Sequence, residues 1–457
     1  MNNKLLGESR VLDWVSFGRV DWPQSEIGRL CYPVKNRNAG LLESTVLSLS
    51  YGQVIVKSAE NMRGLLPANF ETYQLLEPGD VVIRPMDLQN DQTSLRVGQT
   101  RERGIITSAY ISLRPTREVL PRYLFRLFSA LDFMKVFYGF GSGLRQNLDF
   151  RQIRHIPVSV PGMDEQAFIV RYLDNMDLRV ARAIQAKQKL IVLLRERAEA
   201  VANDVLLRGL HEVKMTTVVE IPGLTSAPAH WQRPLAQRVL KERIRPANPL
   251  TDVQLSLSQR DGLVAKSDLR ERSMQTSTFN NWKHVEPGDL VLNRFKAHLG
   301  VFFAATKPGM VSFHYGVFRP VMPVLSEYYE LLFHTPVFKA RFGGLSNGMT
   351  VGLQNLSNQS FYNAHLLVPP LAEQKEIVRA VRNAQQPTVS AIEAVDFEIA
   401  LLREYRIKLI SDVVTGKKDV RAEAAGMKDI DPLELTRVLG GMTETGDDGL
   451  EEDEDAE

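Results

Sequence analysis

Cysteine is almost absent from this chain, which holds a single one, Cys31, among 457 residues. One thiol cannot form a disulfide within the chain and cannot supply a cysteine-based zinc site. Long hydrophobic runs are also missing, since no stretch approaches the roughly 18 apolar residues that span a bilayer. The N-terminus has no apolar core of signal-peptide length, because Glu8 and Asp13 interrupt it early. These absences predict a cytoplasmic protein without a membrane segment.

Sequence motifs that indicate an enzyme are missing as well. Gly416-Lys417-Lys418 lacks the earlier glycine and the hydroxyl of a phosphate-binding loop. The glycines within residues 139–143 precede a predicted strand rather than a helix that could bind a dinucleotide. Asn248-Pro249-Leu250 lacks the second proline and the aromatic residue of the amino-methyltransferase motif. No partner at metal-ligand spacing accompanies His314, His334 or His365. We therefore expect no catalytic residue, metal or cofactor in this chain.

The net charge of +2 conceals an uneven distribution. Residues 447–457 hold eight acids and no base, so the rest of the chain carries +10. A basic body suits a polyanionic partner such as nucleic acid. Many soluble proteins carry a similar excess, so charge alone does not decide the function. The first interpretation of the acidic tail is a disordered, solvated segment. The alternatives are that it screens the basic body or that it is an inhibitory mimic of DNA.

An internal repeat organises the chain. Residues 76–83, Leu-Glu-Pro-Gly-Asp-Val-Val-Ile, recur 209 positions later as Val-Glu-Pro-Gly-Asp-Leu-Val-Leu at residues 285–292. Pro-Gly-Asp is typical of a turn that leads into a strand. Further matches follow in the same order at offsets of 205 to 208: residues 47–50 with 255–258, 104–115 with 309–320, 146–148 with 354–356, 160–161 with 368–369, and 165–166 with 373–374. Because the matches are collinear, they indicate a duplicated module. Residues 84–103 and 294–308 differ greatly between the copies.

Each copy is predicted to be an α+β domain with a curved sheet, followed by a long helix. The globular parts read as short strands between turns, with helical patterns at residues 120–136 and 326–342. Apolar residues then recur every three or four positions up to Gly209 and Gly416, with Pro387 predicted to split the second helix. The predicted organisation is a first domain at 1–161, a first helix at 162–210, a second domain at 211–370, a second helix at 371–416, and a C-terminal extension at 417–457.

The long helices are expected to pair with each other. About 45 residues form a rod of roughly 65 Å with a narrow apolar seam that needs a partner. The two helices are predicted to form an antiparallel coiled coil that relates the copies by an approximate twofold axis. The alternative is that each helix packs on its own domain, which the charged faces at residues 195–197 and 403–406 make less favourable.

The module junctions carry a resemblance to a known family. They read Gln-Asn-Leu, then Val-Pro, then Glu-Gln and a helix, and the second helix ends in Leu-Ile-Ser-Asp-Val-Val-Thr-Gly-Lys at residues 409–417. Over residues 10–425 the chain resembles the specificity subunit of type I restriction-modification systems. Residues 73–80 and 87–90 are similar to a common type of first target-recognition domain. Only the acidic tail departs from the usual pattern.

The resemblance implies a subunit that binds double-stranded DNA and is not itself an enzyme. It implies two methyltransferase subunits as partners and, through them, two ATP-dependent restriction subunits that serve phage defence. S-adenosylmethionine, ATP and Mg would be used by those partners. Two other interpretations stay open: a scaffold whose coiled coil joins proteins without DNA, and a phage-defence system without restriction.

Candidate DNA-reading residues follow from base chemistry, in which Arg and Lys suit guanine and Asn and Gln suit adenine. Residues that read the target should differ between copies, which favours Arg101, Arg103, Arg294, Lys296 and His298. The shared Gln-Asn-Leu is more typical of a turn, and any one arginine could instead form a salt bridge. The full candidate set is Arg84, Gln92, Arg96, Arg101, Arg103 and Arg145 in the first domain, and Gln259, Arg260, Asn293, Arg294, Lys296, His298, Asn347 and Thr350 in the second.

The two domains are expected to contact separate half-sites of one duplex. The paired helices would set the spacing, roughly one turn of B-DNA or about 34 Å. Affinity would then fall steeply with salt concentration.

Overall fold

A computed structural model of the chain describes residues 21–50, 52–57, 70–86, 88, 95–140, 147–258, 262–268, 281–347 and 354–440. It divides into two compact units, one of Met1–Leu190 with Val395–Glu457 and one of Ile191–Ala394. Both long helices pass from one unit into the other, so each unit contains a part of both. Within the described residues, no helix is long and apolar enough to cross a membrane.

The first unit is built on a four-stranded antiparallel sheet with the order β2-β9-β6-β7. These strands are β2 (Cys31–Pro33), β9 (Ile111–Pro115), β6 (Val81–Ile83) and β7 (Val97–Gln99). Three antiparallel pairs accompany the sheet: β1 (Gln24–Glu26) with β10 (Pro157–Ser159), β3 (Leu47–Ser50) with β4 (Gln53–Val56), and β5 (Gln74–Leu76) with β8 (Gly104–Ile106). The helices of the domain are α2 (Ile27–Leu30), α3 (Pro121–Phe133) and α4 (Phe150–Ile153), with short 3-10 turns η2 (Phe70–Thr72) and η3 (Val136–Gly139).

The second unit repeats the four-stranded sheet and two of the three accompanying pairs, and an isolated bridge between Gln232 and Val368 stands where the first unit has the pair β1–β10. Its four-stranded antiparallel sheet has the order β13-β20-β17-β18, formed by β13 (Leu240–Glu242), β20 (Tyr315–Pro320), β17 (Leu290–Asn293) and β18 (Phe302–Ala304). The accompanying pairs are β14 (Leu255–Ser258) with β15 (Gly262–Ala265), β16 (Lys283–Val285) with β19 (Gly309–Val311), and β11 (Met215–Thr217) with β12 (Ser226–Pro228). Its helices are α6 (Ser326–Phe333), α7 (Pro336–Leu345) and α8 (Asn358–Tyr362), with η4 (Ala236–Arg238), η5 (Lys266–Asp268) and η6 (Arg294–Leu299). The duplication predicted from the sequence is therefore a duplication of fold.

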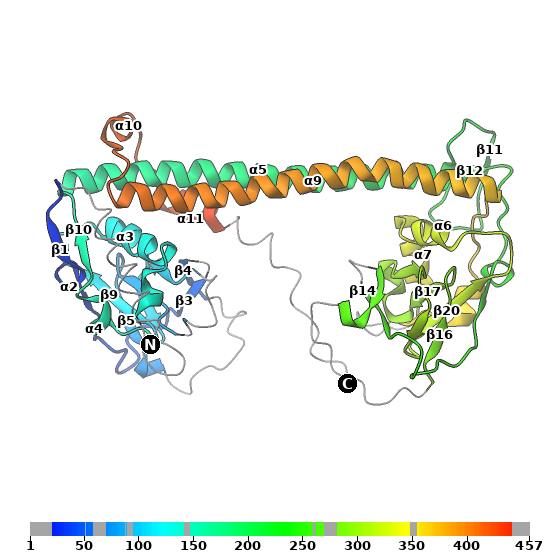
Figure 1. The fold of residues 1–457 in the computed structure, drawn as a ribbon, viewed down its shortest axis with the longest axis horizontal. Coiled ribbons are helices and arrows are strands. Elements are labelled where there is room, and N and C mark those ends of the chain that lie inside the picture. The colour runs from blue at the N-terminus through cyan, green and yellow to red at the C-terminus, as the bar shows by residue number, and fades with distance from the viewer. Residues whose placement is uncertain are drawn as a thin grey trace. The chain divides into compact units, whose positions relative to one another are not determined.

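The two long helices are α5 (Met163–Arg208) and α9 (Leu371–Val414), and they run side by side in opposite directions (Figure 1). In the first unit, Leu173 of α5 shares a buried core with Leu409 of α9. In the second unit, Leu206 shares a core with Ile377. Position numbers rise along one helix as they fall along the other, so the predicted antiparallel pairing is confirmed. The chain continues past α9 into α10 (Arg421–Ala425) and α11 (Pro432–Gly440).

The predicted break at Pro387 is wrong, because α9 is one continuous helix. A proline inside a helix removes one backbone hydrogen bond and crowds the preceding turn. Here the proline ring lies on the exposed face of α9, while Val381 and Val395 on either side are buried. Packing on both sides of the proline therefore holds the helix together.

The long helices also pack on the globular domains, so the two arrangements weighed from the sequence occur together. In the first unit, Arg126 of α3 bonds Asp174 at 2.7 Å and Asp177 at 2.6 Å, both on α5. Arg406 of α9 bonds the same Asp177 at 2.7 Å. Burial opposes the charge on Asp177, but the two arginines outweigh it and lower its pKa to about 2. One carboxylate thus connects the domain to both helices.

The repeated Pro-Gly-Asp motif proves to be a framework turn. Asp80 accepts the backbone N–H of Glu77 at 2.8 Å, and Asp289 accepts that of Glu286 at 2.8 Å. Both aspartates are buried, and each forms a two-bond ion pair with an arginine of a neighbouring segment. The motif recurs because it shapes the turn and ties it to the sheet, and these bonds leave little of the aspartate free for a ligand.

The repeated Glu-Gln pair fixes each domain to its long helix. Gln166 accepts the N–H of Leu120 at 2.8 Å and donates to the Pro161 carbonyl at 3.0 Å. Gln374 accepts the N–H of Leu325 at 2.9 Å and donates to the Pro369 carbonyl at 2.8 Å.

The glutamate of each pair binds a tryptophan at the start of its domain. Glu165 accepts from the Trp22 indole at 3.2 Å, and Glu373 accepts from the Trp231 indole at 3.0 Å. This tryptophan pair, 209 residues apart, is a further repeat that the sequence comparison missed. We call each glutamate, glutamine and tryptophan set a joint.

Candidate nucleic-acid interface

In the second domain, two segments far apart in the sequence meet beyond the end of strand β17. The backbone N–H of Leu356 donates to the carbonyl of Arg294 at 3.0 Å. Asn347 and Asn355 exchange two backbone hydrogen bonds, of 3.0 and 2.8 Å, which place Asn347 beside Asn355. Helix α7 packs beside η6. The structure therefore gathers five of the candidates: Asn293, Arg294, Lys296, His298 and Asn347.

The side chains in this cluster differ in their exposure and in their hydrogen bonds. Asn293 caps η6 by accepting the N–H groups of Phe295 and Lys296 at 3.1 and 3.3 Å. Lys296 and Asn347 are exposed, whereas His298 is partly buried and its Nδ1 has no hydrogen-bond partner within the described residues. The exposed pair is best placed to reach a ligand.

Arg294 is held from two sides. Its Nη2 donates to Glu242 at 3.1 Å and to Asn358 at 2.8 Å. Lys283 bonds the same Glu242 carboxylate at 3.0 Å. Arg294 therefore links β13, η6 and α8, and its first role is to hold the loop in place.

An exposed aromatic strip beside Lys296 was not predicted from the sequence. The rings of Phe313 and His314 lie 3.8 Å apart between their centroids, and His314 lies 5.8 Å from Phe295. Phe313 is 50% exposed and Phe295 is 40% exposed. Phe313 lies in the β19–β20 turn, away from η6 in the chain, so no local pattern connects it to Lys296. Apolar rings on a basic surface can contact thymine methyl groups or base faces.

The first domain has the same junction between its loops. The backbone N–H of Leu148 donates to the carbonyl of Pro85 at 2.9 Å, as Leu356 does to Arg294 in the second domain. Both leucines are buried, so the leucine of the shared Gln-Asn-Leu fixes a turn, in line with the interpretation made from the sequence. Arg84 lies at this junction and is partly exposed. The candidates Gln92, Arg145, Gln259, Arg260 and Thr350 lie outside the described residues.

Arg96 does not belong to a DNA-reading surface, because its side chain is buried, at 0% exposure. Its guanidinium donates to the backbone carbonyls of Met86 at 2.6 Å and Arg84 at 3.3 Å, and to the Tyr138 hydroxyl at 2.9 Å. A side chain enclosed in this way supports the loop from beneath and cannot contact a base. We therefore withdraw it as a candidate.

Arg101 and Arg103 lie away from the Arg84 junction. Arg103 is exposed and sits 3.7 Å from Glu43 and 3.8 Å from Glu77. Arg101 donates to the backbone carbonyl of Pro432 at the start of α11. Burial, together with the positive charge of Arg122, lowers the pKa of Arg101 to about 10. The favoured pair of the first domain thus has protein partners already.

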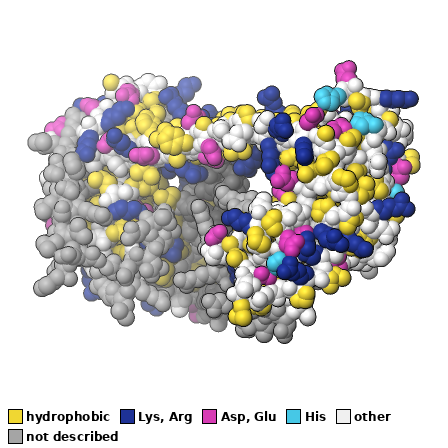
Figure 2. Space-filling view, turned by 45° about the vertical axis from the view of Figure 1, so that its right-hand side comes forward, with side chains coloured by type: hydrophobic (Ala, Val, Ile, Leu, Met, Phe, Trp, Pro, Cys, Tyr) yellow, Lys and Arg dark blue, Asp and Glu magenta, His cyan; other side chains and the backbone are white. Residues whose placement is uncertain are grey.

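Ion pairs occupy many of the other cations in the second unit. Figure 2 shows Lys and Arg side chains across the presented face of this unit, with Asp and Glu side chains among them. Arg243 bonds Glu286 at 2.9 Å and Asp289 at 2.7 Å, and Arg245 bonds Glu286 at 2.7 Å. Basic composition alone therefore does not mark the interface. The described part of the chain holds no group of His, Cys, Asp or Glu placed to bind a metal ion.

Comparisons with protein-family models and with curated proteins find no match for this chain. A chain from a structure of a type I restriction-modification system, concerning complex assembly and conformational transition, matches with 14% sequence identity and a TM-score of 0.61. The match covers 88% of this chain and 99% of that chain. The two chains share one fold. The α+β fold with paired long helices, predicted from the sequence pattern, is therefore confirmed.

Two further solved structures match less closely. The HsdS subunit from Thermoanaerobacter tengcongensis has 14% identity and a TM-score of 0.44, with coverage of 88% of this chain and 98% of that chain. The S subunit of a type I restriction-modification system from M. genitalium has 10% identity and a TM-score of 0.31, with coverage of 86% and 96%.

Proposed function

We propose that this chain is the DNA-specificity subunit of a type I restriction-modification system, in which each domain reads one half of a bipartite target. The proposal rests on the contrast between the parts of the repeat that the two copies share and the parts that differ. The turns and joints that fix each domain are the same in both units, while the paired loops that follow β6 and β17 differ. A shared framework that presents different polar loops suits a protein that reads two different half-sites.

In the second domain, we assign base contacts first to Lys296 and Asn347. Both are exposed, and both carry donors or acceptors suited to base edges in the major groove. Phe295 and Phe313 would add apolar contacts next to them, and Arg294 would hold the loop in register. In the first domain, Arg84 occupies the corresponding junction.

The outer faces of α5 and α9 suit protein partners. Phe397 is 65% exposed and Leu193 is 50% exposed, although each lies on a long helix whose other face is already packed. Exposed large apolar side chains of this kind are typical of interaction surfaces. We propose that two methyltransferase subunits dock here and carry two restriction subunits. S-adenosylmethionine, ATP and Mg would be used by those partners, and no reaction would be catalysed by this chain.

Exchanging the second domain for that of a related chain tests the proposal directly. Sequencing of methylated bases in cells that carry the hybrid should show one half of the target changed and the other half retained. A hybrid that altered both halves would contradict independent reading by the two domains. No loss of methylation on removing the whole chain would refute the DNA-specificity function and favour a scaffold.

Lys296→Ala tests the assigned surface. Losing one base or phosphate contact should weaken DNA binding by about 1–3 kcal/mol, roughly 5- to 150-fold. Lys307→Ala is the matched control, because Lys307 is an exposed lysine on the β18–β19 turn of the same domain. Equal effects of the two substitutions in a fluorescence-anisotropy titration would mean that the η6 surface has no special role.

A further inference from the structure

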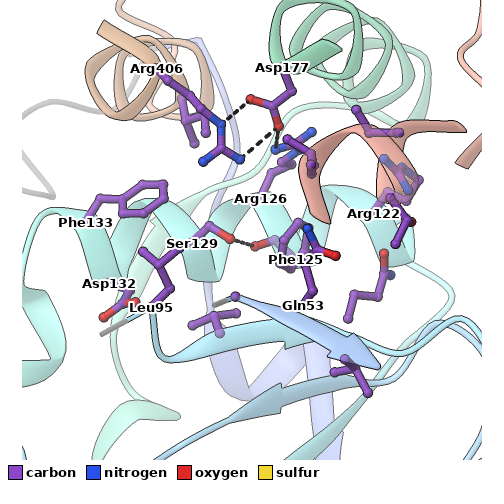
Figure 3. A pocket seen from close by; sticks show the side chains of 18 of the residues that line it. Gln53, Leu95, Arg122, Phe125, Arg126, Ser129, Asp132, Phe133, Asp177 and Arg406 are labelled. Carbon is purple, nitrogen blue, oxygen red and sulfur yellow. Dashed lines mark hydrogen bonds and ion pairs between the residues drawn. The ribbon is translucent and has the colours of Figure 1, made fainter. Parts of the chain in front are cut away.

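The first unit contains a cavity of about 520 Å³ that the proposed function does not use. Its floor includes Gln53 and Leu95, and α3 contributes Phe125, Ser129 and Phe133 (Figure 3). Helices α5, α9 and α11 supply the remaining walls. Small-molecule sites commonly have about 300–1,000 Å³, so the cavity has the size of a ligand site.

Positive charge dominates the lining. Arg122 and Arg126 share Asp174, each at 2.7 Å, and Arg126 and Arg406 share Asp177. Three arginines are thus balanced by two carboxylates. The five lining arginines are Arg101, Arg122, Arg126, Arg403 and Arg406, against two lining acids, Asp132 and Asp177.

Two of these arginines, the partly buried Arg101 and the exposed Arg403, have no carboxylate at ion-pair distance among the described residues. Burial and the nearby positive charge of Arg122 lower the pKa of Arg101. The Nε atoms of Arg122 and Arg126 are also buried and have no hydrogen-bond partner in the part of the chain that the structure describes. Buried donors without acceptors are unfavourable, and an anion in the cavity would relieve both the charge and the missing bonds.

The rest of the lining is apolar. Ile407 and Ile410 of α9 and Leu435 and Leu439 of α11 face the same space as the phenylalanines of α3. A fully hydrated inorganic ion would leave these surfaces without contacts. We propose that the cavity binds a small organic anion, in which a carboxylate or phosphate meets Arg101 and Arg403 and an aromatic or aliphatic body packs against the apolar walls.

The site stands apart from the DNA-specificity function and gives Arg101 another role. Arg101 is the candidate base reader that α11 covers through the Pro432 carbonyl. A ligand that contacts α3, α9 and α11 together would tie the first domain to its helices. Bound ligand should therefore raise the melting temperature of the chain by mass action, by about 5 °C at a large excess over Kd.

Isothermal titration calorimetry of the full chain with four probes tests the site. AMP supplies a phosphate on an aromatic body and octanoate supplies a carboxylate on an aliphatic one, while adenosine and octanol are their neutral counterparts. We expect one of the two anions to bind with a Kd below about 1 mM, and its neutral counterpart to bind at least tenfold more weakly. Which anion binds distinguishes a nucleotide from an acyl ligand. Equal binding of an anion and its neutral counterpart, or binding of neither anion, would overturn the proposal.

Variants locate the binding within the cavity. Arg101→Gln and Arg403→Gln should each lower the affinity for the anion about tenfold, because each removes a charged hydrogen-bond donor. Arg197→Gln is the control, since Arg197 is an exposed arginine on α5 outside the cavity. Thr436→Trp should fill the space and abolish binding without a change of charge, while DNA binding persists. Identical affinities for all four variants would place the anion elsewhere and refute the assignment.

One further arm concerns the acidic residues 447–457. The titration is repeated with a full-length variant in which these eight acids are replaced by Asn and Gln. Unchanged binding would support a small-molecule ligand. Binding seen only in this variant would show that the chain's own acidic segment occupies the cavity, and the small-molecule proposal would be wrong.

Discussion

Replacing Gln374 by leucine should loosen the second domain from its long helix. The Gln374 side chain is buried and makes two hydrogen bonds, to the Leu325 N–H and to the Pro369 carbonyl. Leucine has a similar volume, so the main loss is of these bonds rather than of packing. Each backbone group left without a partner costs about 1–3 kcal/mol. The Leu325 bond is only partly buried, so we expect a total of about 2–4 kcal/mol.

Hydrogen exchange followed by mass spectrometry can locate this loss. In Gln374→Leu, peptides that contain Leu325 and the start of α9 should exchange about 30-fold faster or more, whereas the first domain should be unchanged. Gln386→Leu is the control, because Gln386 is an exposed glutamine on the same helix. Gln166→Leu should produce the mirror result in the first domain. Exchange rates in Gln374→Leu that match those of Gln386→Leu would refute the idea that the joint holds the domain.

Three other substitutions test the framework. Asp177→Asn should destabilise the first unit by about 3–5 kcal/mol at pH 7, because the buried Arg126 and the partly buried Arg406 lose a partner. Since the pKa of Asp177 is lowered to about 2, this difference should be present above pH 4 and shrink as the pH falls from 4 to 2, which urea unfolding at several pH values would reveal. Pro387→Ala should stabilise the second unit by about 1–3 kcal/mol by restoring a helical N–H, and an unchanged midpoint in thermal unfolding would count against this. Arg294→Ala should lower the thermal stability of the second unit as well as DNA affinity, because among the described residues Glu242 would keep only Lys283 as a cationic partner. A loss of affinity with full stability would make Arg294 a direct contact instead.

The large elements of this fold could be predicted from the sequence because their signals are periodic. Apolar residues every three or four positions located α5 and α9, and the repeated turns located β6 and β17. Pro387 misled the prediction, because local propensity carries no information about the packing on either side of it. The pairing of the short strands could not be predicted from the sequence, because it depends on contacts between distant residues.

The candidate site was predictable only in part, for a related reason. The sequence pointed to polar loops after β6 and β17, and the structure brings the second of these against the stretch that contains Asn347. Nothing near Arg96 in the sequence indicates burial, because its partners include backbone carbonyls, which every residue has. The cover over Arg101 comes from Pro432, 331 residues later in the chain. Such long-range contacts have no local signature.

The joints have a consequence for how such a chain can change over generations. Trp22 and Glu165 meet in one joint, and Trp231 and Glu373 meet in the other, so each domain starts and finishes at a single point on its helix. Insertions or deletions in the loops between those two points leave the tryptophan and glutamate of the joint in place. The offset between copies drifts from 209 to 205 and back to 208 along the domain, as such freedom allows. Each domain can therefore be exchanged as a cassette by recombination at its joint, and under the proposed function such an exchange would change one half of the target in one step.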